Sequence, residues 1–299
     1  MVDDKIYSMV KVYELGSFVA AAKALNLTQP AVSQHIKAIE QEFGVTIFDR
    51  QHGKVAVTRQ GEKILRTAQK MIGMEMQIAQ ELRDNNAVPS KLTIGITHTA
   101  ECNPIVEALA RFSRSNNDVQ LKIVTKPSDK LYRALEQYEA DLIVVNGQIR
   151  DTSLEYINLG SDSLMAFVSR NHPLAKRDSV SLSRLKTEPL ILRLPYSGTQ
   201  ELFTSHLRSR NESIADFRVV IETDNVATIK ELVMKNFGCT ILPKSACMDE
   251  IRDGSLAALE VEDMDMKRDM LIAFQKDFRY PDTVREIADT YRKLVNGEL

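Results

Sequence analysis

One predicted helix, between Thr28 and Phe43, carries polar side chains on the side opposite its apolar stripe. The apolar stripe has helical spacing and consists of Val32, Ile36, Ile39 and Phe43. The outward polar side chains are Gln29, Ser33, Gln34, His35 and Lys37. Glutamine and serine can bond to base edges or phosphates, and lysine pairs with phosphates. The pattern is typical of a helix that enters the major groove of DNA, although an ordinary two-helix corner of a protein core would also explain it.

A second group of polar residues follows predicted strands or opens predicted helices in the later part of the chain. Its members are Thr97, His98, Thr99, Ser128, Asn146, Ser197 and Thr199. In open α/β sheets, ligands bind beyond the carboxyl ends of strands, where helix N-termini offer free backbone N–H groups. We therefore expect these residues to line a cleft for a small polar or anionic ligand. The alternative is that each serine or threonine only caps a helix.

Catalytic and metal-binding patterns are weak. His98 and Cys102 have the spacing of a metal-ligand or nucleophile pair, but no third member stands near them. The three cysteines, Cys102, Cys239 and Cys247, are widely spaced and predict neither a disulfide framework nor a zinc site. Glycine-rich phosphate and dinucleotide motifs are absent from the sequence. We expect a protein that is not an enzyme and has no metal or cofactor.

The elements that position the outward side chains can be read from capping residues. Ser17 is a good N-cap for an alanine-rich helix that ends near Asn26. Thr28 caps the next helix, and Pro30 stands in its first turn, where a missing N–H costs nothing. Leu27 is expected to be an apolar plug between the two helices.

Beyond this pair of helices, a small hairpin and a long helix are predicted. The hairpin turns at residues 51–54 and carries Arg50 and Lys54, which would lie beside the DNA backbone. Thr58 caps a helix that runs from Arg59 to about Arg83. An apolar stripe along this helix includes Leu65, Ala68, Ile72, Ala79 and Leu82. A helix this long has no evident core to lie on, so its stripe predicts pairing with a second copy.

The run SFVAAAKALNLTQPAVSQHIKAIEQEFGVTIFDR, followed by VTRQGE, resembles the winged helix-turn-helix of LysR-type transcriptional regulators. The resemblance implies DNA contacts, for which the candidate residues are Ser17, Thr28, Gln29, Pro30, Ser33, Gln34, His35, Lys37, Arg50 and Lys54. It also implies a homodimer through the long helix and a homotetramer through further contacts between effector domains. Promoter DNA, a small-molecule co-inducer and RNA polymerase are the partners that it suggests.

After a polar hinge at residues 84–90, strands and helices alternate in βαβ fashion, which predicts a parallel, doubly wound sheet. The fold class is a multidomain α/β protein. Residues 1–58 form the winged helix-turn-helix and 59–88 the linker helix and hinge. Residues 89–299 form a two-lobed effector domain that resembles periplasmic solute-binding proteins. Lobe 1 spans about 89–160 and 266–299, and lobe 2 about 161–265.

Three further expectations concern the ligand and the setting. Asn146 replaces an arginine found in some family members, and Tyr196 is the only aromatic residue in the cleft segments, so we expect a small ligand. Arg193 stands one residue from the end of its predicted strand and could meet a carboxylate, although a surface or lobe-bridging charge is the favoured expectation. The segment Leu194–Asp216 lacks the cysteine pair of peroxide-sensing members, which favours a metabolite, although a redox-responsive regulator or one without a ligand stays an alternative. The N-terminus lacks an apolar leader and no apolar run approaches membrane-spanning length, which predicts a cytoplasmic protein.

Overall fold

The computed structural model describes residues 1–49, 55–83, 88–116, 119–147 and 151–298. The chain divides into two compact units, an N-terminal one of residues 1–86 with 136–139 and a second one of residues 87–135 and 140–299. In the described ranges, no helix is both long and apolar enough to cross a membrane.

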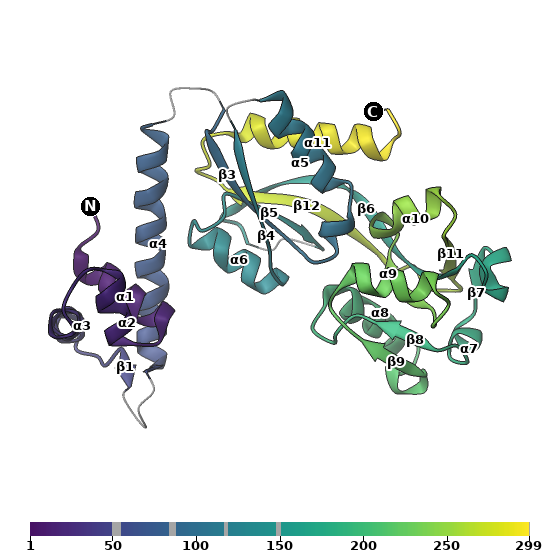
Figure 1. Cartoon of the computed structure of the whole chain (residues 1–299), viewed down its shortest axis with the longest axis horizontal. Helices are drawn as coiled ribbons and strands as arrows, with labels where there is room; N and C mark the ends of the chain where they lie inside the picture. The colour runs from purple at the N-terminus through teal and green to yellow at the C-terminus, as the bar shows by residue number, and fades with distance from the viewer. Residues whose placement is uncertain (50–54, 84–87, 117–118, 148–150, 299) are drawn as a thin grey trace. The chain divides into compact units, whose positions relative to one another are not determined.

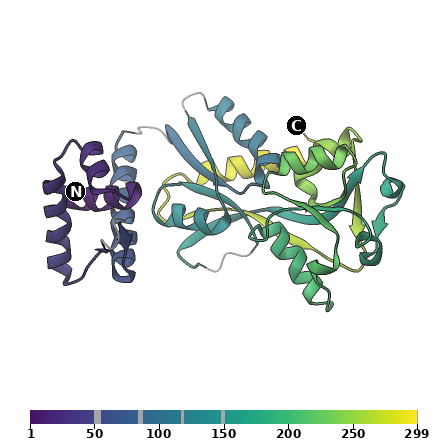
Figure 2. The ribbon, with the colours of Figure 1, turned by 60° about the horizontal axis from the view of Figure 1, so that its bottom comes forward.

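The N-terminal unit is a helical domain with a two-stranded wing (Figures 1 and 2). Its elements are α1 (Asp4–Leu15), α2 (Phe18–Ala24), α3 (Gln29–Phe43), β1 (Phe48–Asp49), β2 (Ala56–Val57) and α4 (Arg59–Glu81), with β1 and β2 antiparallel. Hydroxyl caps start three of the helices, because Ser17, Thr28 and Thr58 each accept a hydrogen bond from a backbone N–H in the first turn. These caps confirm the predicted helix starts.

The core behind α3 differs from the prediction at two positions. Val32, Ile36 and Ile39 are buried as expected, but Phe43 is 58% exposed and Leu27 is exposed too. The Glu40 carboxylate accepts hydrogen bonds from the backbone N–H groups of Ile47 and Phe48, at 2.7 and 3.3 Å. Ile47 and Phe48 are buried in the same apolar core as Val32, Ile36 and Ile39, whereas Phe43, the last residue of α3, stays outside it.

Helix α4 is only partly without a core. Leu65 and Ala68 are buried in the core of the N-terminal unit, which corrects the expectation that the whole helix lacks support. The second half is different, since it presents large apolar side chains to solvent. They are Met71, Met74, Met76, Ile78 and Leu82. The apolar stripe of α4 therefore has two parts. The first is buried in the core of its own unit, and the second is exposed and can pair with a second copy of the helix.

The second unit contains a mixed sheet shared by two lobes. In lobe 1, β3 (Lys91–Ile96) lies parallel to β4 (Gln120–Thr125) and β5 (Leu142–Asn146), while β12 (Lys267–Gln275) is antiparallel to β5. Helices α5 (Ile105–Ser115) and α11 (Pro281–Val295) pack on one face of this sheet and α6 (Ser128–Glu136) on the other (Figure 1). The sheet is thus doubly wound, but it is not purely parallel.

Strand β6 (Leu154–Ser169) joins the two lobes. Its first half pairs antiparallel with β12, and its second half pairs with β10 (Thr240–Pro243) and β11 (Leu256–Val261). In the register of β6 with β12, Arg268 lies opposite Asp162 at the passage between the lobes.

Lobe 2 surrounds a second apolar core. Its remaining elements are β7 (Ser179–Val180), α7 (Leu182–Leu185), β8 (Leu190–Leu192), α8 (Gly198–Arg208), β9 (Val219–Glu222), α9 (Val226–Met234) and α10 (Met248–Arg252). Phe203 and Leu207 of α8 are fully buried in this core, which fixes the N-terminal end of α8 at the pocket described below.

Candidate functional sites

The first candidate site is the outer face of α3. The side chains of Thr28, Gln29, Pro30, Gln34 and Lys37 are exposed, and Ser33 is half-buried. The Gln29 amide donates a hydrogen bond to the Ser33 hydroxyl at 2.9 Å, so the two side chains present one joint polar patch. The exposed side chains lie on the opposite face of α3 from the buried Val32 and Ile36. A helix that binds in the major groove needs this arrangement.

Three of the predicted DNA contacts need separate comment. His35 was expected on the outer face, but its ring is half-buried and its Nδ1 lies 2.7 Å from the hydroxyl of buried Ser8 in α1. Ser17 accepts the N–H of Ala20 and is half-buried at the start of α2. Arg50 and Lys54 lie outside the described residues.

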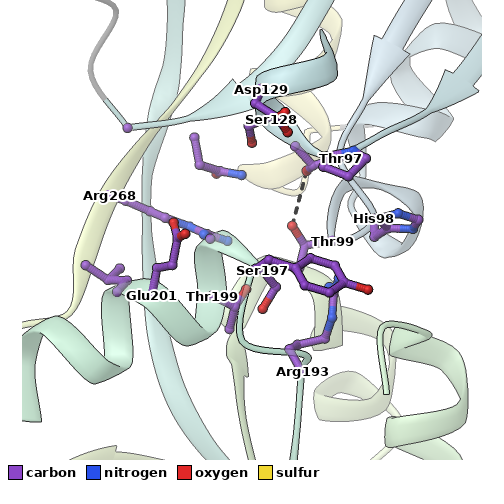
Figure 3. A pocket seen from close by; sticks show the side chains of 16 residues that line it. Thr97, His98, Thr99, Ser128, Asp129, Arg193, Ser197, Thr199, Glu201 and Arg268 are labelled. Atoms are coloured by element: carbon purple, nitrogen blue, oxygen red, sulfur yellow. Dashed lines mark hydrogen bonds between the residues drawn. The ribbon is translucent and has the colours of Figure 1, made fainter. Parts of the chain in front are cut away.

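The second candidate site is a pocket of about 730 Å³ in the effector unit (Figure 3). All seven residues predicted for the cleft line it: Thr97, His98, Thr99, Ser128, Asn146, Ser197 and Thr199. They come from the ends of β3 and β5 and the starts of α6 and α8. This volume lies in the range of small-molecule sites.

Two arginines that line the same pocket change its chemistry. Arg193 follows β8 and is only 4% exposed, which corrects the expectation of a surface charge. Arg268, which the sequence reasoning missed, enters the pocket from β12. Its guanidinium lies beside the start of α8, since Nη1 would be 3.7 Å from a Cβ placed on Gly198. Among the described residues, Arg193 Nε and Arg268 Nε and Nη2 are shielded from solvent and have no hydrogen-bond partner.

Burial opposes the charge of both guanidinium groups. It lowers the pKa of Arg193, an effect that the Asp224 carboxylate opposes. The pKa of Arg268 is lowered to about 10, because burial and the positive charge of Arg193 lower it more than the Asp162 carboxylate raises it. Arginine side chains stay protonated in proteins. The pocket therefore holds two shielded positive charges that repel each other, and an anion between them would relieve this.

Two helix N-termini add backbone donors to the pocket. In the described part of the chain, the N–H groups of Gly198 and Thr199 in α8, and of Ser128 and Asp129 in α6, donate to no protein acceptor. The Thr199 hydroxyl and the Asn146 side-chain oxygen also lack partners there, whereas the hydroxyls of Thr97 and Thr99 lie 3.2 Å apart and bond to each other. The pocket thus presents unpaired donors from two helix N-termini and two arginines, together with the unpaired Asn146 oxygen.

The cysteines and the side chains that could bind a metal form no comparable site in the described part of the chain. Cys239 and Cys247 are buried, and burial raises the pKa of Cys239 to about 12 and that of Cys247 still further. Burial also raises the pKa of the half-buried Cys102 thiol. Within the described ranges, no group of three or more His, Cys, Asp or Glu side chains is arranged to hold a metal ion.

Known proteins support the two-part reading. The LysR substrate binding domain matches residues 85–295, and the bacterial regulatory helix-turn-helix protein, lysR family, matches residues 4–62. An uncharacterised HTH-type transcriptional regulator of Methanocaldococcus jannaschii is 26% identical over 93% of this chain and 94% of its own.

Solved structures share the fold. Full-length OxyR from Pseudomonas aeruginosa superimposes with a TM-score of 0.71 at 22% identity, covering 98% of this chain and 95% of that one. Full-length CbnR in complex with its target DNA has a TM-score of 0.66 at 18% identity, covering 98% and 99%. With the helix-turn-helix at its start and the substrate-binding domain over most of its length, the chain belongs to the LysR family of DNA-binding transcriptional regulators.

Proposed function

We propose that this regulator is switched by a small anion that binds in the pocket between Arg193, Arg268 and the N-terminus of α8. The observation that carries the proposal is the set of three guanidinium nitrogens that are shielded from water and unpaired among the described residues. A buried donor without a partner costs about 1–3 kcal/mol, and more when it is charged. A carboxylate, sulfate or phosphate group would recover this free energy, whereas a neutral ligand would leave both charges uncompensated.

The proposed contacts follow from the chemistry of each residue. Arg193 and Arg268 pair with the anionic group, and the N–H groups of Gly198 and Thr199 bond to the same group at the start of α8. Lobe 1 adds polar contacts around the rest of the ligand. The proposed lobe 1 contacts are Thr97, His98, Thr99, Ser128 and Asn146.

The DNA-binding side of the proposal rests on α3. We assign operator contacts to Thr28, Gln29, Pro30, Ser33, Gln34 and Lys37, and phosphate contacts to Ser17, Arg50 and Lys54. The exposed apolar half of α4 pairs with its copy in a dimer, so that two recognition helices meet two half-sites. In this division, residues 1–58 bind DNA, 59–88 link and dimerise, and 89–299 bind the effector, with lobes at 89–160 with 266–299 and at 161–265.

A ligand can switch the protein only if it binds one arrangement of the lobes better than another. The pocket is suited to such a difference, since Arg193, Ser197, Gly198 and Thr199 line it from lobe 2, while Arg268 and the polar groups of Thr97, Thr99, Ser128 and Asn146 line it from lobe 1. An anion held by Arg268 would touch the β12–β6 passage itself. Promoter DNA is the partner that reads the resulting change, and RNA polymerase is a further candidate.

Thermal unfolding of the full chain tests the anion site. Sulfate, inorganic phosphate and acetate are titrated against the parent, Arg193→Gln, Arg268→Gln and the control Arg208→Gln. Arg208 is exposed at the far end of α8 and does not line the pocket. We expect at least one anion to raise the Tm of the parent and of the control in a concentration-dependent manner, and neither pocket variant to respond. Equal shifts in all four proteins would contradict the proposal.

A further inference from the structure

The two walls of the effector pocket carry different chemistry. Each wall contains a helix N-terminus, that of α6 from lobe 1 and that of α8 from lobe 2, and each helix has one acidic residue in its first turn, Asp129 and Glu201. Both carboxylates line the pocket, and both are exposed. A first-turn acid is favourable at any helix N-terminus, so the carboxylates alone do not distinguish the walls.

The distinction comes from the groups beside each helix. Beside α8 stand the two arginines, whose nitrogens are shielded and unpaired among the described residues. Lobe 1 adds no arginine on the α6 side of the pocket lining, and there Asn146 has a shielded side-chain oxygen without a partner in the described chain. In Figure 3, Asp129 and Ser128 lie with Thr97 on the side of the pocket away from Arg193. Charged side-chain donors without partners thus stand beside α8, whereas the side-chain groups of the α6 wall that face the ligand include the acceptors Asn146 and Asp129.

From this asymmetry we infer that the effector has two unlike ends, an anionic head held by Arg193 and Arg268 and a tail that carries hydroxyl or amino donors toward Asp129. The inference rests on the proposed anion site and specifies the ligand class for it. A second anionic group at the tail would meet the Asp129 carboxylate and be repelled. An apolar tail would leave that carboxylate and the Asn146 oxygen without donors, which costs binding free energy.

The negative charge of the ligand head follows from the two arginines. The head compensates the two guanidinium charges, which no protein acceptor pairs directly in the described ranges. Asp162 faces Arg268 across β6 and β12, but its two carboxylate oxygens already accept the Ser245 N–H at 3.1 Å and the Ser245 hydroxyl at 2.6 Å. The described structure shows hydrogen bonds from Ser245 to Asp162 and none from Arg268 Nε or Nη2, so these two nitrogens are left for the ligand.

Matched probe molecules test the two-ended ligand. For a phosphate head, methyl phosphate carries the head alone and glycerol 1-phosphate carries head and hydroxyl tail. For a carboxylate head, the pair is propionate and glycerate. Glycerol, which carries the tail alone, is included with both. Dissociation constants are measured by calorimetry on the full-length parent, Asp129→Asn, Asp129→Ala, Glu201→Gln and Arg268→Gln.

We expect the hydroxylated anion to bind the parent about tenfold more tightly than its matched anion, because hydrogen bonds to a charged group are worth more than neutral ones. Asp129→Asn should reduce this ratio and Asp129→Ala should bring it close to one. Glu201→Gln, which makes the same change on the other wall, should keep the ratio. Arg268→Gln should abolish binding of both anions. The head pair that binds more tightly identifies phosphate or carboxylate as the anionic group.

A ratio near one in the parent, or a ratio that persists in Asp129→Ala, would overturn the inference. The proposed anion site would survive either result if both anions still bind the parent and fail to bind Arg268→Gln. If none of the four anions binds the parent, both the inference and the proposed site are wrong.

Discussion

The two functional regions of this chain are built in opposite ways. On α3, the proposed DNA contacts are exposed side chains on a regular helix, backed by a buried apolar face. In the effector pocket, the strongest candidate groups are buried charges whose nitrogens have no partner in the described chain. The first arrangement suits a large, charged and hydrated partner that is reached from solution. The second suits a small ligand that replaces the missing hydrogen bonds.

The comparison predicts that substitutions in the two regions affect the stability of the protein differently. Changes on α3 should weaken binding and leave folding unchanged. In the pocket, some changes should weaken binding and stabilise the empty protein, because the unpaired polar groups there cost free energy in the absence of ligand. The following predictions run from the largest expected effect to the smallest.

The largest effect is expected from the exposed half of α4. Ile78→Glu combined with Leu82→Glu places two charges on the free apolar face, which should dissociate the dimer and abolish binding to an operator with two half-sites. Light scattering and gel shift measure the two outcomes. The exposed pair Lys63→Glu and Arg66→Glu, on the first half of α4, places two glutamates away from this face with an even larger change of charge and should leave a dimer. A stable dimer in the Ile78/Leu82 variant would place the interface elsewhere.

The first half of α4 should respond in the opposite way. Leu65 is 2% exposed in the N-terminal core, so Leu65→Ala should lower the free energy of unfolding of that unit by about 2–5 kcal/mol. Hydrogen exchange on the full chain measures the stability of this unit through the protection of its backbone amides. A variant that loses dimerisation while the exchange protection of α1 to α3 stays at the parent level would contradict the division of α4 into two parts.

On α3, Gln29→Ala and Ser33→Ala should each weaken operator binding by about 1–3 kcal/mol, because each removes part of one joint polar patch. Thermal stability should stay at the parent value, since Gln29 is exposed. The measurement is a salt-matched titration of operator DNA selected in vitro. His35→Ala is the informative contrast, as it should destabilise the fold through loss of the Ser8 contact. Parent affinity in both Gln29→Ala and Ser33→Ala would remove α3 from the operator contacts.

In the pocket, Thr199→Val should raise the stability of the ligand-free protein by about 1 kcal/mol, because it replaces a shielded, unpaired hydroxyl with a methyl group. The same variant should respond more weakly to an activating anion. Thr99→Val should also reduce the response but should not stabilise, since its hydroxyl bonds to Thr97. Thermal unfolding with and without sulfate separates the two. Equal stability changes in both variants would show that the unpaired hydroxyl of Thr199 carries no cost.

The smallest effect is a pH dependence in the N-terminal unit. The Tyr7 hydroxyl donates to the Glu75 carboxylate at 2.6 Å, which lowers the pKa of Glu75 and raises that of Tyr7 to about 12. A lowered carboxylate pKa stabilises the fold above the ordinary pKa of Glu and is lost as pH falls through the lowered value. Tyr7→Phe should therefore reduce stability at neutral pH and converge with the parent in acid. Parallel curves of Tm against pH would exclude this coupling.

Sequence reasoning located the two regions with unequal success, and the reason is physical. Helical periodicity and hydroxyl caps report local structure, so the face of α3 and all seven predicted pocket residues could be found from neighbouring residues alone. His35 and Phe43 were misplaced because contacts from other elements decide burial. His35 contacts Ser8 of α1, and the core behind α3 includes Ile47 and Phe48 but not Phe43.

Arg268 illustrates what sequence periodicity cannot supply. Its position in the pocket depends on the antiparallel register of β12 with β6, which brings a residue from near the end of the chain opposite Asp162. The charged triplet Lys267–Asp269 at the start of an apolar strand was only a weak signal of a pocket residue, since such triplets also occur on protein surfaces. Arg193 was noticed at its strand end, but its burial depends on how lobe 2 packs.

The central claim is that an anion in the arginine-lined pocket controls how the protein holds its operator. The direct measurement is a footprint on operator DNA selected in vitro, recorded with a panel of small carboxylates and phosphates for the parent and for Arg193→Gln combined with Arg268→Gln. We predict that at least one anion changes the footprint of the parent, while the double variant protects the same DNA as the ligand-free parent and responds to none. A footprint change that persists in the double variant would contradict the claim.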